Sequence, residues 1–159
     1  NFLSQSYIII LMSNIIIYTD GACKGNPGVG GWGAIIFYKD KSKKIYGYEE
    51  NTTNNRMEIT AAIKALSLFQ EESNITIYTD SKYLMDGINS WLLKWKTNNW
   101  KTANKKDVKN VDLWKKIDEL NLLHNVEWKW VKGHSGDTGN DIADELANLA
   151  ISTKGENTL

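Results

Sequence analysis

Apolar residues along the chain fall into short runs whose spacing predicts five strands. The run at 15–20 is continuous rather than alternating, as is typical of a strand buried on both faces. Positions 21–28 consist of turn-forming residues and are expected to form a loop. The other strands are predicted at 32–38, 45–49, 75–80 and 126–131, and the first three are close enough in sequence to form an antiparallel meander.

Helical spacing of apolar residues appears in three further segments. Residues 56–69 show it directly after the capping-type residues 51–55, and helices are also predicted near 111–123 and at 140–151. This order of elements predicts an α/β fold: a five-stranded mixed sheet, three antiparallel strands followed by two parallel ones, with helices on both faces.

Length and composition fit one ordinary globular domain. The chain has 159 residues, of which 42% are apolar and 24% are charged. A single cysteine, Cys23, excludes an internal disulfide and a multi-cysteine zinc site, and the apolar run near the amino end is too short to span a bilayer. We therefore expect a soluble, reduced, cytoplasmic protein. Residues 13–152 are expected to form the domain, with an N-terminal extension at 1–12 and a C-terminal tail at 153–159.

The tripeptide Tyr-Thr-Asp occurs twice, at 18–20 and 78–80, each time at the end of a predicted buried strand. If these strands are parallel, Asp20 and Asp80 emerge together at the carboxyl edge of the sheet, where ligands of α/β proteins bind. An aspartate that starts a turn is common, so either one alone would say little. The matched pair favours a site.

Glu58 lies on an apolar stripe of the helix predicted at 56–69, which would point its carboxylate into the core. An unpaired inward carboxylate is costly or becomes protonated. The lone arginine, Arg56, lies on another face of that helix. Residues 55–58 also resemble a capping box, in which the glutamate serves the helix end, and the motif leaves both interpretations open.

Two residues near the carboxyl end complete the candidate chemistry. His134 stands in a loop flanked by glycines, where an imidazole suits proton transfer, although exposed loop histidines without a role are common. Asp144 falls in the early turns of the last predicted helix. With Asp20, Glu58 and Asp80 it makes four oxygen ligands suited to Mg²⁺ or Mn²⁺. Two such ions roughly 3.5–4 Å apart would activate water against a phosphodiester.

The formal net charge is zero, which argues against a nucleic-acid ligand until the charges are placed. Residues 91–116 hold eight lysines and two aspartates and so carry +6, while the remainder carries −6. The same window contains Trp91, Trp95, Trp100 and Trp114. Lysines between aromatics suit phosphate contact and stacking, whereas the plainer interpretation is a helix hairpin with its own small core. We expect both: partly structural tryptophans, and lysines facing a polyanion.

The chain resembles type 1 ribonuclease H of the bacterial kind over residues 13–151. The resemblance rests on six motifs in order: Tyr-Thr-Asp-Gly at 18–21, Gly-Asn-Pro-Gly at 25–28, Thr-Thr-Asn-Asn-Arg-Met-Glu at 52–58, Tyr-Thr-Asp-Ser at 78–81, Val-Lys-Gly-His at 131–134 and Asn-Asp-Ile-Ala-Asp-Glu-Leu-Ala at 140–147. It implies the ribonuclease H-like fold.

The resemblance also implies an activity. Members of the family cut the RNA strand of RNA–DNA hybrids without sequence specificity, leaving 3′-hydroxyl and 5′-phosphate ends. Its metal ligands fall on Asp20, Glu58, Asp80 and Asp144, which would hold two Mg²⁺ ions, with Mn²⁺ as a substitute. The family's loop histidine, thought to assist proton movement or product departure, falls on His134.

The expected partner is an RNA–DNA hybrid, bound by a monomer without membrane contact. By the resemblance, its contacts fall on Cys23, Asn26, Asn54 and Asn55, with Thr53 in a phosphate-holding pocket, and on the basic protrusion 91–116 through Trp91, Lys94, Lys96, Lys105 and Lys106. Trp91 is expected against the DNA strand. Asp137 departs from the pattern, since many relatives carry a second histidine there, and we expect a tuned loop rather than lost activity.

Two competing hypotheses are a DNA-cutting nuclease of the same fold and a catalytically inactive hybrid-binding module. The complete set of four carboxylates argues against both, and the Thr-Thr-Asn-Asn helix start argues against the first.

Overall fold

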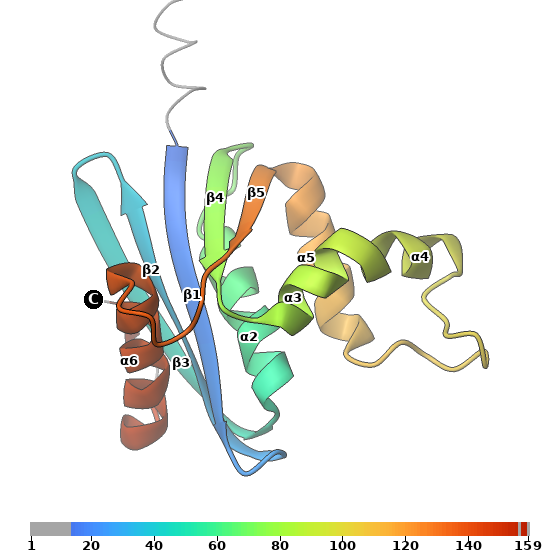
Figure 1. The fold of residues 1–159 in the computed structure, drawn as a ribbon, viewed down its shortest axis with the longest axis horizontal. Coiled ribbons are helices and arrows are strands. Elements are labelled where there is room, and N and C mark those ends of the chain that lie inside the picture. Colours follow the sequence, from blue (N-terminus) through green and yellow to red (C-terminus); the bar gives the residue numbers. More distant parts are fainter. Residues whose placement is uncertain (1–13, 156, 159) are drawn as a thin grey trace, which may run out of the picture.

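A single mixed sheet forms the centre of the computed structural model, which describes residues 14–155 and 157–158 (Figure 1). The predicted N-terminal extension lies outside the described residues. The strands are β1 (Asn14–Lys24), β2 (Gly28–Tyr38), β3 (Lys41–Thr52), β4 (Asn74–Thr79), β5 (Asn125–Trp130) and β6 (Asn157–Thr158), in the spatial order β5-β4-β1-β2-β3-β6. β1, β2 and β3 are antiparallel and β4 and β5 are parallel to β1, so the predicted five-stranded arrangement is confirmed.

The repeated tripeptide is explained by the pairing of β1 with β4. The two strands run parallel in register, with Tyr18 beside Tyr78 and Thr19 beside Thr79. The tyrosine rings stack at 4.7 Å, and both threonines are fully buried on the opposite face of the sheet. Because the two strands run parallel in register, they bring Asp20 and Asp80 to the same level of the sheet.

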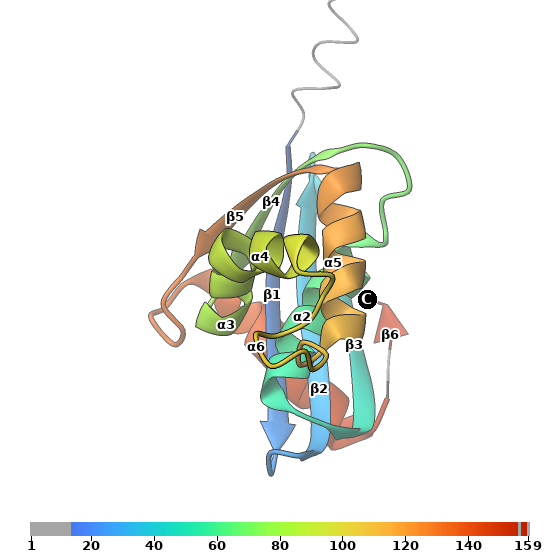
Figure 2. The same cartoon turned by 90° about the vertical axis from the view of Figure 1, so that its right-hand side faces the viewer.

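Helices cover both faces of the sheet (Figures 1 and 2). They are α2 (Asn54–Leu66), α3 (Lys82–Asp86), the π-helical turn η1 (Gly87–Trp91), α4 (Leu92–Thr97), α5 (Val111–Leu123) and α6 (Thr138–Thr153). α6 packs on one face of β1, β2 and β3, where added Cβ atoms at Gly31 and Gly33 would strike its backbone. α2 and α5 cover the other face and enclose the main apolar core. None of the described helices is long and apolar enough to cross a membrane.

Several element bounds differ from the sequence-based expectation, among them the end of β1 and the start of the predicted C-terminal tail. The loop predicted at 21–28 is mostly strand: β1 continues to Lys24 and pairs with β2, whose first residue is Gly28, so only 25–27 form the turn. Pairing between the two strands overrides the local turn preference of these residues. At the carboxyl end, β6 adds two residues of the predicted tail to the exposed edge of β3 and satisfies part of that edge.

The predicted basic protrusion, 91–116, begins at the end of η1, extends from the body through α4 and the following loop, and returns at the start of α5 (Figure 1). Its tryptophans are partly structural, as expected. Trp114 is fully buried and packs against Trp95 at 5.3 Å, and Gly87 lies so close to the Trp114 ring that no larger residue would fit.

Candidate active site

Three carboxylates meet at a site formed by β1, the end of β4 and α2. Asp20 is the residue of β1 that lies opposite Gly33 of β2, Asp80 follows the last residue of β4, and Glu58 lies in the second turn of α2. One carboxylate oxygen from each lies within 4.8 Å of the other two. Asp20 and Glu58 are each only 5% exposed, and Asp80 is half-buried.

Gly21 permits this close approach of β1 to α2. A Cβ atom at this position would lie 2.5 Å from the backbone nitrogen of Glu58. The backbone N–H of Gly21 donates to Oδ1 of Asp20 at 2.9 Å and orients that carboxylate. The glycine that follows the first aspartate is therefore part of the site.

The two interpretations of Glu58 are separated by the helix start. Thr53 is the N-cap of α2, and its hydroxyl accepts from the backbone N–H of Arg56 at 3.2 Å. The capping-box interpretation of 55–58 is therefore wrong, and Glu58 points inward. Its Oε2 is buried and finds no hydrogen-bond partner among the described residues.

The carboxylates hold their protons more tightly than ordinary acids. The pKa of Asp20 rises from 3.8 to about 8, first because the side chain is buried and second because the Asp80 carboxylate lies nearby. Burial, and after it the carboxylates of Asp20 and Asp80, raise the pKa of Glu58 well above its ordinary value. Burial also raises the pKa of Asp80. Clustered like charges of this kind are destabilising without a counter-ion.

This donor set fits divalent metal ions. Carboxylate oxygens are the ligands that Mg²⁺ and Mn²⁺ prefer, and Oε2 of Glu58 is a buried oxygen that has no hydrogen-bond partner among the described residues. A positive ion among Asp20, Glu58 and Asp80 would stabilise their charged forms against both burial and mutual repulsion, the two causes that raise their pKa values.

Asp144 and His134 face the same open cleft of about 450 Å³ as the three carboxylates. Asp144 lies on α6 outside the closest trio, and Asn148 donates to its Oδ1 at 3.3 Å. His134 is exposed in its loop and has a positive φ of 55°. Asp137, where the chain departs from many relatives, is the N-cap of α6 and accepts from the backbone N–H of Asn140 at 3.1 Å.

Of the residues predicted to contact a hybrid, those near the helix start are brought to the cleft. Asn54 and Asn55 line it, and Oδ1 of Asn26 accepts from the backbone N–H of Asn54 at 3.0 Å. Cys23 lies nearby, since its thiol lies 3.5 Å from the carbonyl of Thr52.

The protrusion residues lie beside the cleft rather than in it. Trp91 packs against Tyr83, which lines the cleft, with ring centroids 5.5 Å apart. Lys96 forms an ion pair with Asp118 at 3.2 Å, whereas Lys94, Lys105 and Lys106 form none among the described residues.

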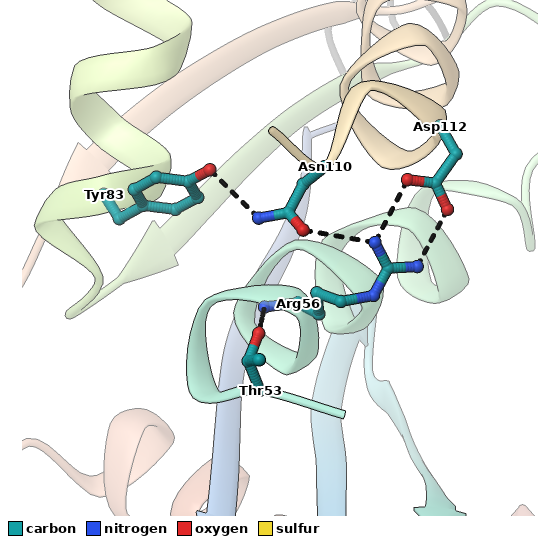
Figure 3. A network of polar contacts seen from close by, with 5 residues as sticks. All are labelled: Thr53, Arg56, Tyr83, Asn110 and Asp112. Carbon is teal, nitrogen blue, oxygen red and sulfur yellow. Dashed lines mark hydrogen bonds and ion pairs between the residues drawn. The ribbon is translucent and has the colours of Figure 1, made fainter. Parts of the chain in front are cut away.

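Sequence reasoning missed Tyr83 and the polar network that holds it (Figure 3). Arg56 donates to both carboxylate oxygens of Asp112, at 3.0 and 2.8 Å, and to Oδ1 of Asn110 at 3.2 Å. Asn110 in turn donates to the Tyr83 hydroxyl at 3.1 Å. This network ties the start of α2 to the base of the protrusion. No local pattern indicates it, because its members are up to 56 residues apart.

Known proteins resemble this chain closely. The RNase H family model matches residues 12–152. Ribonuclease H of Francisella tularensis subsp. novicida (strain U112) is 64% identical over 139 residues, which cover 87% of this chain and 91% of the relative. Ribonuclease H of Francisella philomiragia subsp. philomiragia matches to the same extent.

Solved structures share the fold. LC9-RNase H1, a type 1 RNase H with the type 2 active-site motif, superposes with a TM-score of 0.82 at 29% identity, covering 91% of this chain and 74% of that one. LC11-RNase H1, solved in complex with an RNA/DNA hybrid, gives a TM-score of 0.67 at 26% identity, covering 88% and 98%. The cluster of three carboxylates, the fold around it and these matches lead to one conclusion: the chain belongs to the ribonuclease H family.

Proposed function

We propose that the protein hydrolyses the RNA strand of RNA–DNA hybrids with the aid of two divalent metal ions. The observation that carries the proposal is the buried trio of Asp20, Glu58 and Asp80 at the floor of an open cleft. Membership of the ribonuclease H family and the hybrid bound by LC11-RNase H1 support the choice of substrate.

The carboxylates would hold the ions, with Asp144 as the fourth ligand on the exposed side of the cleft. When bound, such ions would supply an activated water as the nucleophile and positive charge against the phosphodiester. The Gly21 N–H keeps the Asp20 carboxylate oriented, and Asn148 does the same for Asp144. Burial keeps bulk water away from Glu58.

His134 would act in proton transfer through a nitrogen of its imidazole ring. Its loop sets it at the edge of the cleft, exposed to water and on the same side as Asp80 and Asp144. Histidine is the side chain most often used as a general acid in proteins, so His134 suits proton transfer to the departing 3′-oxygen. The products would carry 3′-hydroxyl and 5′-phosphate ends.

Substrate choice would depend on small polar groups at the start of α2. Asn54 and Asn55 line the cleft beside the carboxylates, where a ribose 2′-hydroxyl distinguishes RNA from DNA. Cys23, Asn26 and Thr53 would support the same surface. Lysines on the protrusion would contact phosphates of the hybrid, which adds affinity without sequence preference.

We further propose Mg²⁺ as the resident ion, replaceable by Mn²⁺, and a monomer that acts in the cytoplasm. Cleavage of labelled hybrid, duplex DNA and duplex RNA, each with Mg²⁺ and with chelator, tests the main proposal. We expect cleavage of the hybrid's RNA strand in Mg²⁺ alone. Cleavage of duplex DNA, or hybrid cleavage that survives chelation, would contradict it.

A further inference from the structure

Lys82 stands out among the residues of the cleft because of its charge. Of the described residues that line the cleft, it is the single lysine, and it shares the cleft with Asp20, Glu58, Asp80 and Asp144. Nevertheless, Lys82 forms no ion pair among the described residues. Its exposed ammonium group is available to another anion.

The ammonium group of Lys82 lies over the ring of Trp130. Nζ of Lys82 lies 5.7 Å from the centroid of the Trp130 ring, within the range of a cation–π contact. Trp130 is the last residue of β5, which ends beside the start of α3 (Figure 1). Its indole N–H donates to the backbone carbonyl of Asp80 at 3.2 Å. The tryptophan thus holds Lys82 at the rim and is itself attached to the segment that carries Asp80.

The positions of Lys82 and Trp130 are not the ones that would give the folded protein the greatest stability. Lys82 is the first residue of α3, where the helix dipole disfavours a positive charge. Trp130 leaves 45% of its surface exposed although it is the last residue of a sheet strand. An exposed cation backed by an exposed aromatic ring at the rim of an acidic cleft is suited to binding a phosphate.

We propose that Lys82, held in place by Trp130, binds a phosphate of the strand that enters the cleft, next to the phosphate that is cut. This inference rests on the proposed function, under which that strand is the RNA strand. Lys82 would be a substrate-binding residue, and Trp130 would be a positioning residue that acts through it.

The test uses Lys82→Met, which keeps the apolar stem and removes the charge, in the full chain. Steady-state cleavage of hybrid in Mg²⁺ gives kcat and KM, and fluorescence anisotropy of labelled hybrid in chelator gives binding without turnover. Lys39→Met is the matched control, because Lys39 also rests on an aromatic ring, that of Tyr38 at 5.2 Å, but lies at the turn between β2 and β3.

We expect Lys82→Met to raise KM at least about threefold at 50 mM salt with little change in kcat, and to lower the slope of log Kd against log salt by about one. The ratio of the variant's Kd to that of the unmodified protein should therefore fall about 3.5-fold between 50 and 200 mM salt, so that a difference of about threefold disappears by 200 mM. Trp130→Leu should raise KM less, and combining it with Lys82→Met should add nothing further. Lys39→Met should match the unmodified protein.

An unchanged KM and salt slope in Lys82→Met would overturn the inference. So would an unchanged slope accompanied only by tighter Mg²⁺ binding, because Lys82 would then merely balance the carboxylates. If the unmodified protein fails to cut hybrid in Mg²⁺, the proposed function fails, while anisotropy in chelator still reports whether Lys82 binds a nucleic-acid phosphate.

Discussion

Replacing Asp20 by asparagine is expected to stabilise the metal-free protein while it abolishes hydrolysis. Asp20 is buried with two other acids, and its pKa rises from 3.8 to about 8 on folding. The unfolded chain therefore loses this proton at a lower pH than the folded protein. Stability from this group is complete below about pH 4 and is lost as the pH rises toward 8.

The magnitude follows from the shift. At 1.36 kcal/mol per pKa unit, holding Asp20 in the folded site at pH 7 costs about 4 kcal/mol relative to the unfolded chain. Asparagine keeps the Oδ1 acceptor for the Gly21 N–H and carries no charge. Because Glu58 and Asp80 share the repulsion, we expect a gain of about 2–4 kcal/mol, or about 5–15 °C in melting temperature for a chain of this size.

Thermal unfolding in chelator at pH 5, 7 and 8 measures this effect, together with Mg²⁺-dependent cleavage of hybrid. The gain from Asp20→Asn should increase from pH 5 to pH 8, and cleavage should disappear while hybrid binding persists. Asp40→Asn, at the exposed turn between β2 and β3, is the matched control and should leave melting unchanged. A melting temperature of Asp20→Asn at or below that of the unmodified protein at pH 8 would refute the reasoning.

Further predictions concern the metal, the close packing at the site and the helix start. Mg²⁺ should raise the melting temperature more at pH 8 than at pH 5, because protons compete for the carboxylates, and Glu58→Gln should weaken this response; an equal response at both pH values would contradict the ligand assignment. Gly21→Ala places a Cβ atom 2.5 Å from the Glu58 nitrogen and should cost about 1–3 kcal/mol in urea unfolding and greatly reduce kcat, so near-normal kcat would exclude the close approach as a requirement. Thr53→Ala removes the N-cap of α2 and should cost about 1 kcal/mol by the same measurement, with Thr53→Ser restoring most of it; an unchanged unfolding midpoint would show that the cap contributes little.

Much of the fold and part of the site follow from sequence because they are local or repeated. Continuous apolar runs mark the buried strands, and the repeated Tyr-Thr-Asp predicts in-register parallel strands that bring Asp20 and Asp80 together. Helix periodicity places Glu58 on the inward face of α2. These features depend on neighbours within a few positions along the chain, so the sequence alone carries them.

Other features were decided only by tertiary packing. The strand through 21–24 overrides turn-forming residues because β2 supplies hydrogen bonds that no local preference anticipates. Whether Glu58 caps α2 or enters the cluster was decided by the N-cap at Thr53 and by the packing of β1 against the helix at Gly21. Lys82 meets Trp130, which lies 48 positions further along the chain, through the pairing of β4 with β5. The physical reason is common to all three: the free energies of burial and pairing depend on surfaces that come together only when the sheet forms.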